Sequence, residues 1–209
     1  AQSMKKLISF LAVCFLSAHI NFAFAGFVAG EDYVVLDKPV KTVTEDKVEV
    51  RELFWYHCPH CFNLEPMVDR WLKTLPSSAK FIRQPAVFSE RWENGAIFYY
   101  VLEQLNEVNR LHGKLFDAIH LHKTPLIDQE DFVDWMADHD VDRKRANNAF
   151  KSFSVRIKLN KSKSNTIKYK VTGVPTFVVN GKYWVDSKRA GGEERLFQVL
   201  DYLIQKEAQ

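Results

Sequence analysis

Two cysteines, Cys58 and Cys61, are separated by only two residues and follow directly after an apolar segment. That segment, residues 48–56, is rich in valine and aromatic residues and predicts a β-strand. Pro59 fits the first turn of a helix, because its missing N–H would have no partner there. Apolar residues then recur at helical spacing. The sequence therefore places both thiols where a strand ends and a helix begins.

This placement predicts different roles for the two thiols. A thiol at a helix N-terminus meets unpaired backbone N–H groups and the positive end of the helix dipole, which favour the thiolate. We expect Cys58 to be the attacking thiol and Cys61, one turn later, to resolve a mixed disulfide. His60 is predicted to lower the pKa of Cys58. A stabilised thiolate makes the disulfide more oxidising, which favours a disulfide donor over a reductant.

Other uses of the Cys-x-x-Cys pair fit the sequence less well. A structural disulfide across two residues would close almost no loop in the unfolded chain. A zinc site needs two further ligands, and no second cysteine pair follows. Haem attachment requires a histidine directly after Cys61, where Phe62 stands. Redox chemistry with no metal and no organic cofactor is the prediction.

Residues 4–25 have the features of a secretory signal: a basic start, an apolar run and a small-x-small cleavage site. The apolar run is shorter than the roughly 20 residues that span a membrane, which favours cleavage over an uncleaved anchor. Residues 1–3 precede the initiator methionine and are interpreted as an artificial extension. Removal of Cys14 with the signal would leave Cys58 and Cys61 in a compartment where disulfides persist.

The rest of the chain alternates between strand and helix signals. A second strand at 80–84 would complete a parallel strand–helix–strand unit. Strands at 176–179 and 182–185 are joined by Asn-Gly, the favoured hairpin turn. Helical periodicity marks residues 96–111, 114–122, 129–138, 143–169 and 193–206. The predicted fold class is α/β, with a mixed central sheet flanked by helices and an inserted all-helical domain.

A second motif, Gly173-Val174-Pro175, precedes the predicted strand at 176–179. A cis Val174–Pro175 bond would explain a proline at this position. Such a bond would present the N–H and C=O of Val174 to an extended substrate strand. A trans proline on an edge strand remains the alternative.

Together, Cys58-Pro59-His60-Cys61 and Gly173-Val174-Pro175 resemble the DsbA family of periplasmic disulfide-donating oxidoreductases. The likeness extends from Gly26 onward. It implies a thioredoxin fold, with Cys58 as exposed nucleophile, Cys61 as buried partner and His60 as thiolate stabiliser. It also implies that Val174 and cis Pro175 form the substrate-binding loop. Four parts are predicted: 1–25, extension and signal; 26–85, thioredoxin-fold first part; 86–168, inserted helical domain; 169–209, thioredoxin-fold second part.

The resemblance also suggests partners and further site residues. Substrates would be unfolded exported proteins with free cysteines, and reoxidation would come from a DsbB-type quinone-linked membrane oxidase. We expect a periplasmic monomer. Glu52 and Glu65 match acidic positions of the family and are candidates for a proton relay to Cys61. A purely structural pair of Glu52 with Arg83 is equally open, and Arg83 stands where the family commonly has lysine.

Charge does not point to nucleic acid. The net charge is only +3. Residues 143–170 are basic without any acidic residue, and a solvated helix face is favoured there over a nucleic-acid or membrane surface. His112, His120, His122 and His139 are predicted to be surface or core residues and not metal ligands.

Two rival functions remain. The same exchange chemistry could run as a reductase or isomerase, although isomerases of this kind usually carry an N-terminal dimerisation domain and residues 26–47 are too few for one. Alternatively, a chaperone could use the groove beside Pro175 while its cysteines stay inert.

Overall fold

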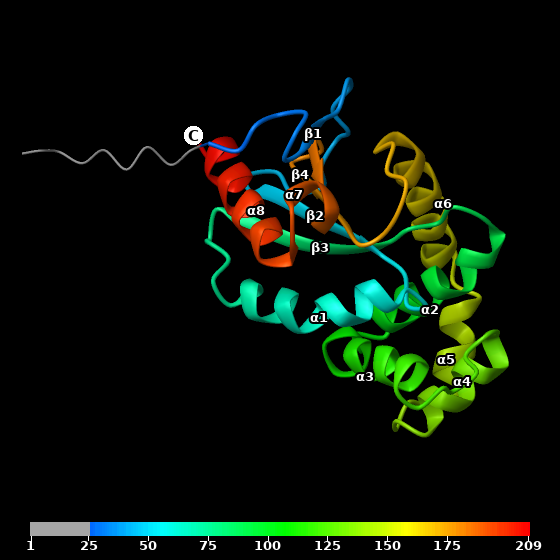
Figure 1. The fold of residues 1–209 in the computed structure, drawn as a ribbon. Helices are drawn as coiled ribbons and strands as arrows, with labels where there is room; N and C mark the ends of the chain where they lie inside the picture. The colour runs from blue at the N-terminus through cyan, green and yellow to red at the C-terminus, as the bar shows by residue number, and fades with distance from the viewer. Residues whose placement is uncertain (1–25) are drawn as a thin grey trace, which may run out of the picture.

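The computed structural model describes residues 26–209 (Figure 1). The predicted extension and signal segment lie outside the described residues. A search of the described helices found none that is both long and apolar enough to cross a membrane.

A five-stranded sheet with the order β1-β5-β4-β2-β3 forms the centre of the molecule. The strands are β1 (Val34–Val35), β2 (Val48–Phe54), β3 (Ala79–Pro85), β4 (Thr176–Val179) and β5 (Tyr183–Val185). β2 and β3 are parallel, and the other pairs are antiparallel. The predicted mixed sheet is confirmed. Only β1 lacks a prediction, because two residues show no periodicity.

Helices cover both faces of this sheet. They are α1 (Pro59–Leu72), η1 (Glu90–Trp92), α2 (Glu93–Gln104), α3 (Val108–His120), α4 (Gln129–Ala137), α5 (Arg143–Phe150), α6 (Phe153–Lys168), α7 (Ser187–Ala190) and α8 (Glu193–Glu207). α1 and α8 share an apolar core with one face of the sheet. Residues just after α6 and in the N-terminal segment cover the other face.

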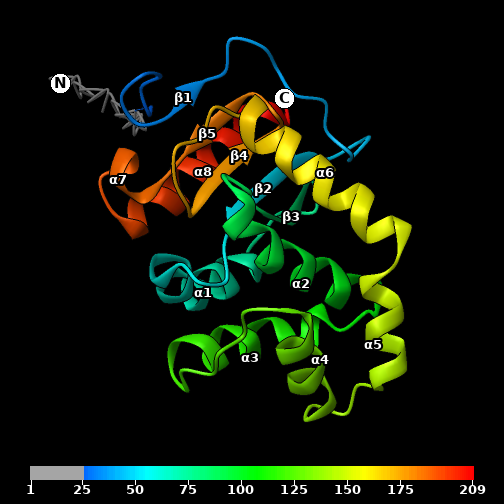
Figure 2. The same cartoon turned by 90° about the vertical axis from the view of Figure 1, so that its right-hand side faces the viewer.

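The helices α2 to α6 form the insertion between β3 and β4 (Figure 2). Two of the stretches with helical periodicity each contain parts of two helices. The stretch 96–111 is divided between α2 and α3, with Asn106 in the left-handed region at φ 61° between them. The stretch 143–169 is also two helices, because the Ser152 side chain accepts a hydrogen bond from Ser154 N–H and caps α6.

The insertion packs directly onto the redox motif. The core of its helices includes Phe98, Phe116 and Phe132, and the same continuous cluster contains Cys58 and Cys61. The helical insertion therefore forms part of the wall around the two thiols.

The hairpin between β4 and β5 was predicted correctly. Asn180 and Gly181 have φ values of 50° and 65°, as the favoured two-residue turn requires. A Cβ atom at Gly181 would lie 1.9 Å from the carbonyl oxygen of Val40. Only glycine fits this close approach.

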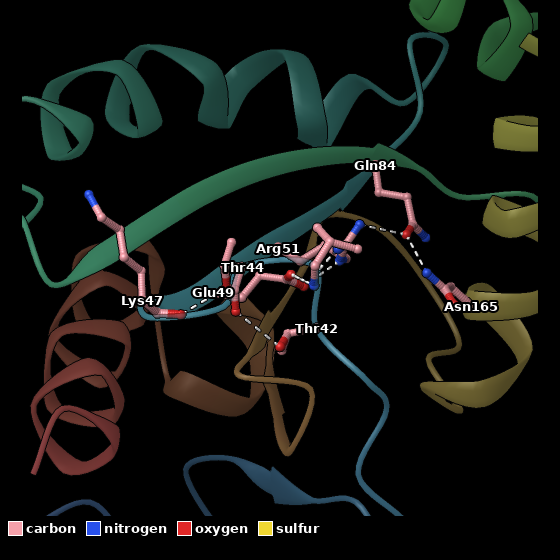
Figure 3. A network of polar contacts seen from close by, with 8 residues as sticks. Thr42, Thr44, Lys47, Glu49, Arg51, Gln84 and Asn165 are labelled. Carbon is pink, nitrogen blue, oxygen red and sulfur yellow. Dashed lines mark hydrogen bonds and ion pairs between the residues drawn. The ribbon is translucent and has the colours of Figure 1, made fainter. Parts of the chain in front are cut away.

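A buried polar network lies on the face of β2 that points toward α6 (Figure 3). Arg51 Nε donates to Glu49 Oε1 at 2.8 Å, and Arg51 Nη1 donates to Gln84 Oε1 at 3.0 Å. Asn165 of α6 donates to the same Gln84 oxygen at 2.9 Å. The second oxygen of Glu49 accepts from the Val43 N–H at 2.8 Å. This network fastens the insertion and the N-terminal segment to the sheet.

Candidate active site

The two cysteines lie at the strand-to-helix junction that the sequence predicts. β2 ends at Phe54, and Cys58 is the N-cap of α1, with Pro59 in the first turn. The Cys58 N–H donates to the Trp55 carbonyl at 3.0 Å, which closes the intervening turn. No side chain caps the helix, so its first N–H groups remain directed at the Cys58 sulfur.

Both cysteines are free thiols and both are buried. Cys58 is 7% exposed and Cys61 is 0% exposed. The expectation of an exposed nucleophile at Cys58 needs correction: Cys58 is only the more accessible of the pair. A carbonyl of the opposite loop covers its sulfur, since Cys58 Sγ lies 3.5 Å from the Val174 oxygen.

The acidities of the two thiols diverge strongly. A hydrogen bond from the Cys61 thiol is the main cause that lowers the pKa of Cys58 to about 6, and the backbone N–H groups of Cys61 and His60 contribute further. The charge of His60 also lowers the pKa of Cys58, as predicted, and contributes least among these causes. Burial and the neighbouring Cys58 raise the pKa of Cys61 well above its ordinary value. At neutral pH the pair therefore holds one thiolate and one thiol.

The Val174–Pro175 peptide bond is cis, as the family resemblance implies. The loop lies across from the helix N-terminus, and a groove of about 290 Å³ separates them. His60, Leu64, Val174, Pro175, Lys188 and Glu193 are among the groove's lining residues. The groove therefore runs directly beside the dithiol.

Glu52 lies beneath the thiols, on the α1 side of β2. Its side chain is fully buried, and neither carboxylate oxygen has a hydrogen-bond partner. Its nearest cation is Arg83, whose Nε is 3.4 Å from Glu52 Oε2. Burial and the charge of Glu65 raise the pKa of Glu52 to about 8, although Arg83 opposes the shift. Glu52 is therefore largely protonated at neutral pH.

Glu65 has more polar partners than Glu52. Arg83 Nη2 donates to Glu65 Oε1, and His112 Nε2 lies 3.3 Å from the same oxygen. Burial opposes ionisation of Glu65, but hydrogen bonds and charge from His112 and Arg83 keep its pKa below its ordinary value. The predicted structural pair of Glu52 with Arg83 is thus a three-residue cluster, in which Glu65 takes the closest contact.

His112 is the residue of this cluster that sequence reasoning did not assign to the site. It is buried on α3, and its Nδ1 lies 2.8 Å from the Tyr56 hydroxyl. Burial lowers its pKa. The sequence shows only a histidine on the apolar face of a helix. Its approach to the motif depends on how the insertion packs, and no local pattern signals it.

Aromatic rings enclose the junction. Trp55 stacks on Trp92 with ring centroids 4.2 Å apart, and Phe62 stacks on His120 at 4.8 Å. Within residues 26–209, no group of three or more His, Cys, Asp or Glu side chains is arranged to hold a metal ion.

A low-pKa cysteine at a helix N-terminus, a buried partner one turn later and a cis-proline loop opposite define a thiol:disulfide oxidoreductase with a thioredoxin fold. Residues 79–203 match the family model described as a DSBA-like thioredoxin domain. The chain belongs to the DsbA family.

Relatives and solved structures agree with this assignment. The thiol:disulfide interchange protein DsbA of Pseudomonas aeruginosa is 39% identical over 87% of this chain and 86% of its own. That of Pseudomonas syringae pv. tomato is 40% identical over 86% and 84%, respectively. The crystal structure of Pseudomonas aeruginosa DsbA superposes with a TM-score of 0.83 at 39% identity, covering 87% of this chain and 94% of that one. For the Xylella fastidiosa oxidoreductase DsbA the TM-score is 0.81 at 29% identity, covering 86% and 97%.

Proposed function

We propose that this enzyme donates its Cys58–Cys61 disulfide to reduced, exported proteins in the periplasm, and that a DsbB-type quinone-linked membrane oxidase regenerates the disulfide. The asymmetry between the two thiols carries the proposal. A reduced pair whose thiolate is stabilised, as the pKa of about 6 at Cys58 indicates, corresponds to a disulfide that is easily reduced.

The exchange proceeds in two displacements. A substrate thiolate attacks Cys58 Sγ, the Cys58–Cys61 bond breaks, and Cys61 leaves with the electron pair. A second substrate thiolate then attacks the substrate sulfur of the mixed disulfide, and Cys58 leaves as a thiolate. The substrate loses two electrons and gains a disulfide, while the enzyme's pair becomes reduced.

Cys61 must take a proton after the first displacement, because its buried thiolate is unfavourable. Glu52 is protonated near neutral pH, and it lies close enough to Cys61 to influence the pKa of that thiol. We assign Glu52 as the proton donor. We assign Glu65, ionised and bound to Arg83, to the electrostatic support of that donor.

Val174 is assigned to substrate binding. Its carbonyl oxygen lies 3.5 Å from Cys58 Sγ in the reduced enzyme. An extended substrate strand would offer backbone groups to the same residue by β-augmentation, which holds the incoming cysteine beside Cys58. No metal or organic cofactor takes part in these steps, and a monomer carries every residue that they use.

The equilibrium of the Cys58–Cys61 disulfide with glutathione tests the direction of transfer. A potential well above the roughly −270 mV of thioredoxin supports donation, and each 30 mV of difference corresponds to about 1.4 kcal/mol. A potential near that of thioredoxin would leave the exchange chemistry intact but assign the enzyme to reduction or isomerisation.

A further inference from the structure

Two further cavities lie near the groove beside the dithiol. Thr172 lines the groove and also a second cavity of about 530 Å³ between the segment after β3 and the end of α6. Ile167 and Lys170 line this second cavity and a third one of about 500 Å³, which reaches the N-terminal segment 36–41. Figure 2 shows these segments side by side. We call the second and third cavities together the distal track.

The floor of the distal track is apolar. Ile167 is 75% exposed and Phe88 is 39% exposed, so both present apolar surface to solvent. The buried side chains of Leu36 and Val171 lie beside them. A polypeptide in this track would cover the exposed apolar surface.

The far end of the track is positively charged. Lys38, Lys41, Lys168 and Lys170 line the third cavity together with a single acidic residue, Asp37. Lys170 pairs with Asp37 at 2.6 Å. The other three lysines make no salt bridge among the described residues. Nearer the dithiol, Lys163 is already paired with Glu93 at 2.7 Å.

We propose that the distal track binds an extended acidic stretch of the substrate polypeptide, beyond the residues that lie against the cis-proline loop. The inference rests on the proposed function, since it names a class of substrate for the same site. Thr172 lines both the groove and the track, which places the track next to the groove, and three lysines without a salt bridge in the described part of the chain complement carboxylates. A hollow of this kind fits a chain and not the flat surface of a membrane.

Electrostatic attraction of this kind acts mainly on the encounter rate and is screened by salt. Substrates with acidic residues near a cysteine should therefore be oxidised faster than basic ones at low ionic strength. The apolar floor contributes equally to both kinds of substrate.

The test uses the oxidised enzyme and three peptides, each with one cysteine that neutral spacers separate on both sides from blocks of glutamate, lysine or serine. The measured quantity is the second-order rate at which the enzyme disulfide is reduced. We expect the glutamate peptide to react about tenfold faster than the lysine peptide at low salt. The ratio should fall to below about threefold in Lys38→Gln/Lys41→Gln/Lys168→Gln.

A matched control removes the same net charge elsewhere. Lys73→Gln/Lys114→Gln/Lys144→Gln changes three exposed lysines that line none of the three cavities. The control should keep the full tenfold ratio. An equal loss in both variants would assign the preference to the overall charge of the molecule and overturn the proposal.

Two further outcomes are decisive. If the track variant keeps its preference for glutamate but loses binding to vesicles of anionic lipid, the lysines face a membrane and the inference is wrong. If even the serine peptide fails to reduce the wild-type disulfide, the proposed function fails. A reactive serine peptide without any charge preference refutes only the distal track.

Discussion

The buried glutamates on the two faces of β2 differ in their hydrogen bonding. On the α6 face, every carboxylate oxygen of Glu49 has a partner: Arg51 on one and the Val43 N–H on the other. On the α1 face, Glu52 has no hydrogen bond to either oxygen and shares Arg83 with Glu65. The residues alternate along one strand, so sequence spacing alone decides which face each one joins.

The difference in hydrogen bonding gives Glu49 a structural role and Glu52 a chemical one. A buried ion pair whose hydrogen bonds are complete holds its charges permanently and connects elements. A buried carboxyl without hydrogen bonds takes up a proton instead, because the ionised form is too costly. The Glu49–Arg51 network therefore fastens the insertion to the sheet, whereas Glu52 stores a proton next to the thiols.

The largest effect is expected from Arg51→Leu. This change leaves the Glu49 carboxylate buried without a counter-charge, and we expect a loss of about 3–5 kcal/mol in the free energy of unfolding. Urea denaturation measures it. The double variant Glu49→Leu/Arg51→Leu should recover most of the loss. A double variant as unstable as Arg51→Leu would contradict the view that apolar side chains can replace this ion pair.

Glu52→Gln should slow disulfide transfer by about tenfold to hundredfold at neutral pH, because the proton donor for Cys61 is lost. Stopped-flow reduction of the enzyme by a cysteine peptide measures the rate. Glu49→Gln is the matched control on the other face and should cost stability without slowing exchange. Equal rates for the wild type and Glu52→Gln would remove Glu52 from the mechanism.

The pH dependence of stability should also differ between the faces. The pKa of Glu52 is raised to about 8 in the folded protein, from about 4.5 in the unfolded chain. Between about pH 4.5 and 8 the folded state therefore binds more protons than the unfolded chain. The free energy of unfolding should fall by up to about 1.4 kcal/mol per pH unit as the pH rises through this range. In the oxidised enzyme the thiols do not titrate, and the difference in slope between the wild type and Glu52→Gln separates the contribution of Glu52 from that of other groups such as His112.

Glu52→Gln should flatten that slope, and Glu49→Gln should retain it. An unchanged slope in Glu52→Gln would show that another group releases the proton.

The sequence predicted the features that local chemistry controls. The β-branched run before Cys58, the proline at the helix start and the Asn180-Gly181 turn each force one backbone geometry. The features it missed depend on packing between distant segments. His112 contacts Tyr56 only because α3 packs on the motif. Arg83 contacts both Glu52 and Glu65 because β3 lies close to α1.

The rank of His60 is a further case of this limit. Its place between the cysteines predicted only that it lowers the pKa of Cys58. The structure assigns the leading contribution to the Cys61 thiol, whose hydrogen bond depends on the turn geometry of α1. Sequence spacing allowed both contributions and did not order them.

The smallest expected effect is the difference between the contributions of Cys61 and His60 to the pKa of Cys58. Cys61→Ala removes the leading hydrogen bond to the Cys58 thiolate and should raise the pKa of Cys58 clearly above about 6, whereas His60→Ser should raise it less. Thiolate absorbance during a pH titration of the reduced enzyme measures both values. A larger shift in His60→Ser than in Cys61→Ala would make the histidine the leading contribution instead. It would also mean that the helix turn positions the two sulfurs without tuning the attacking one.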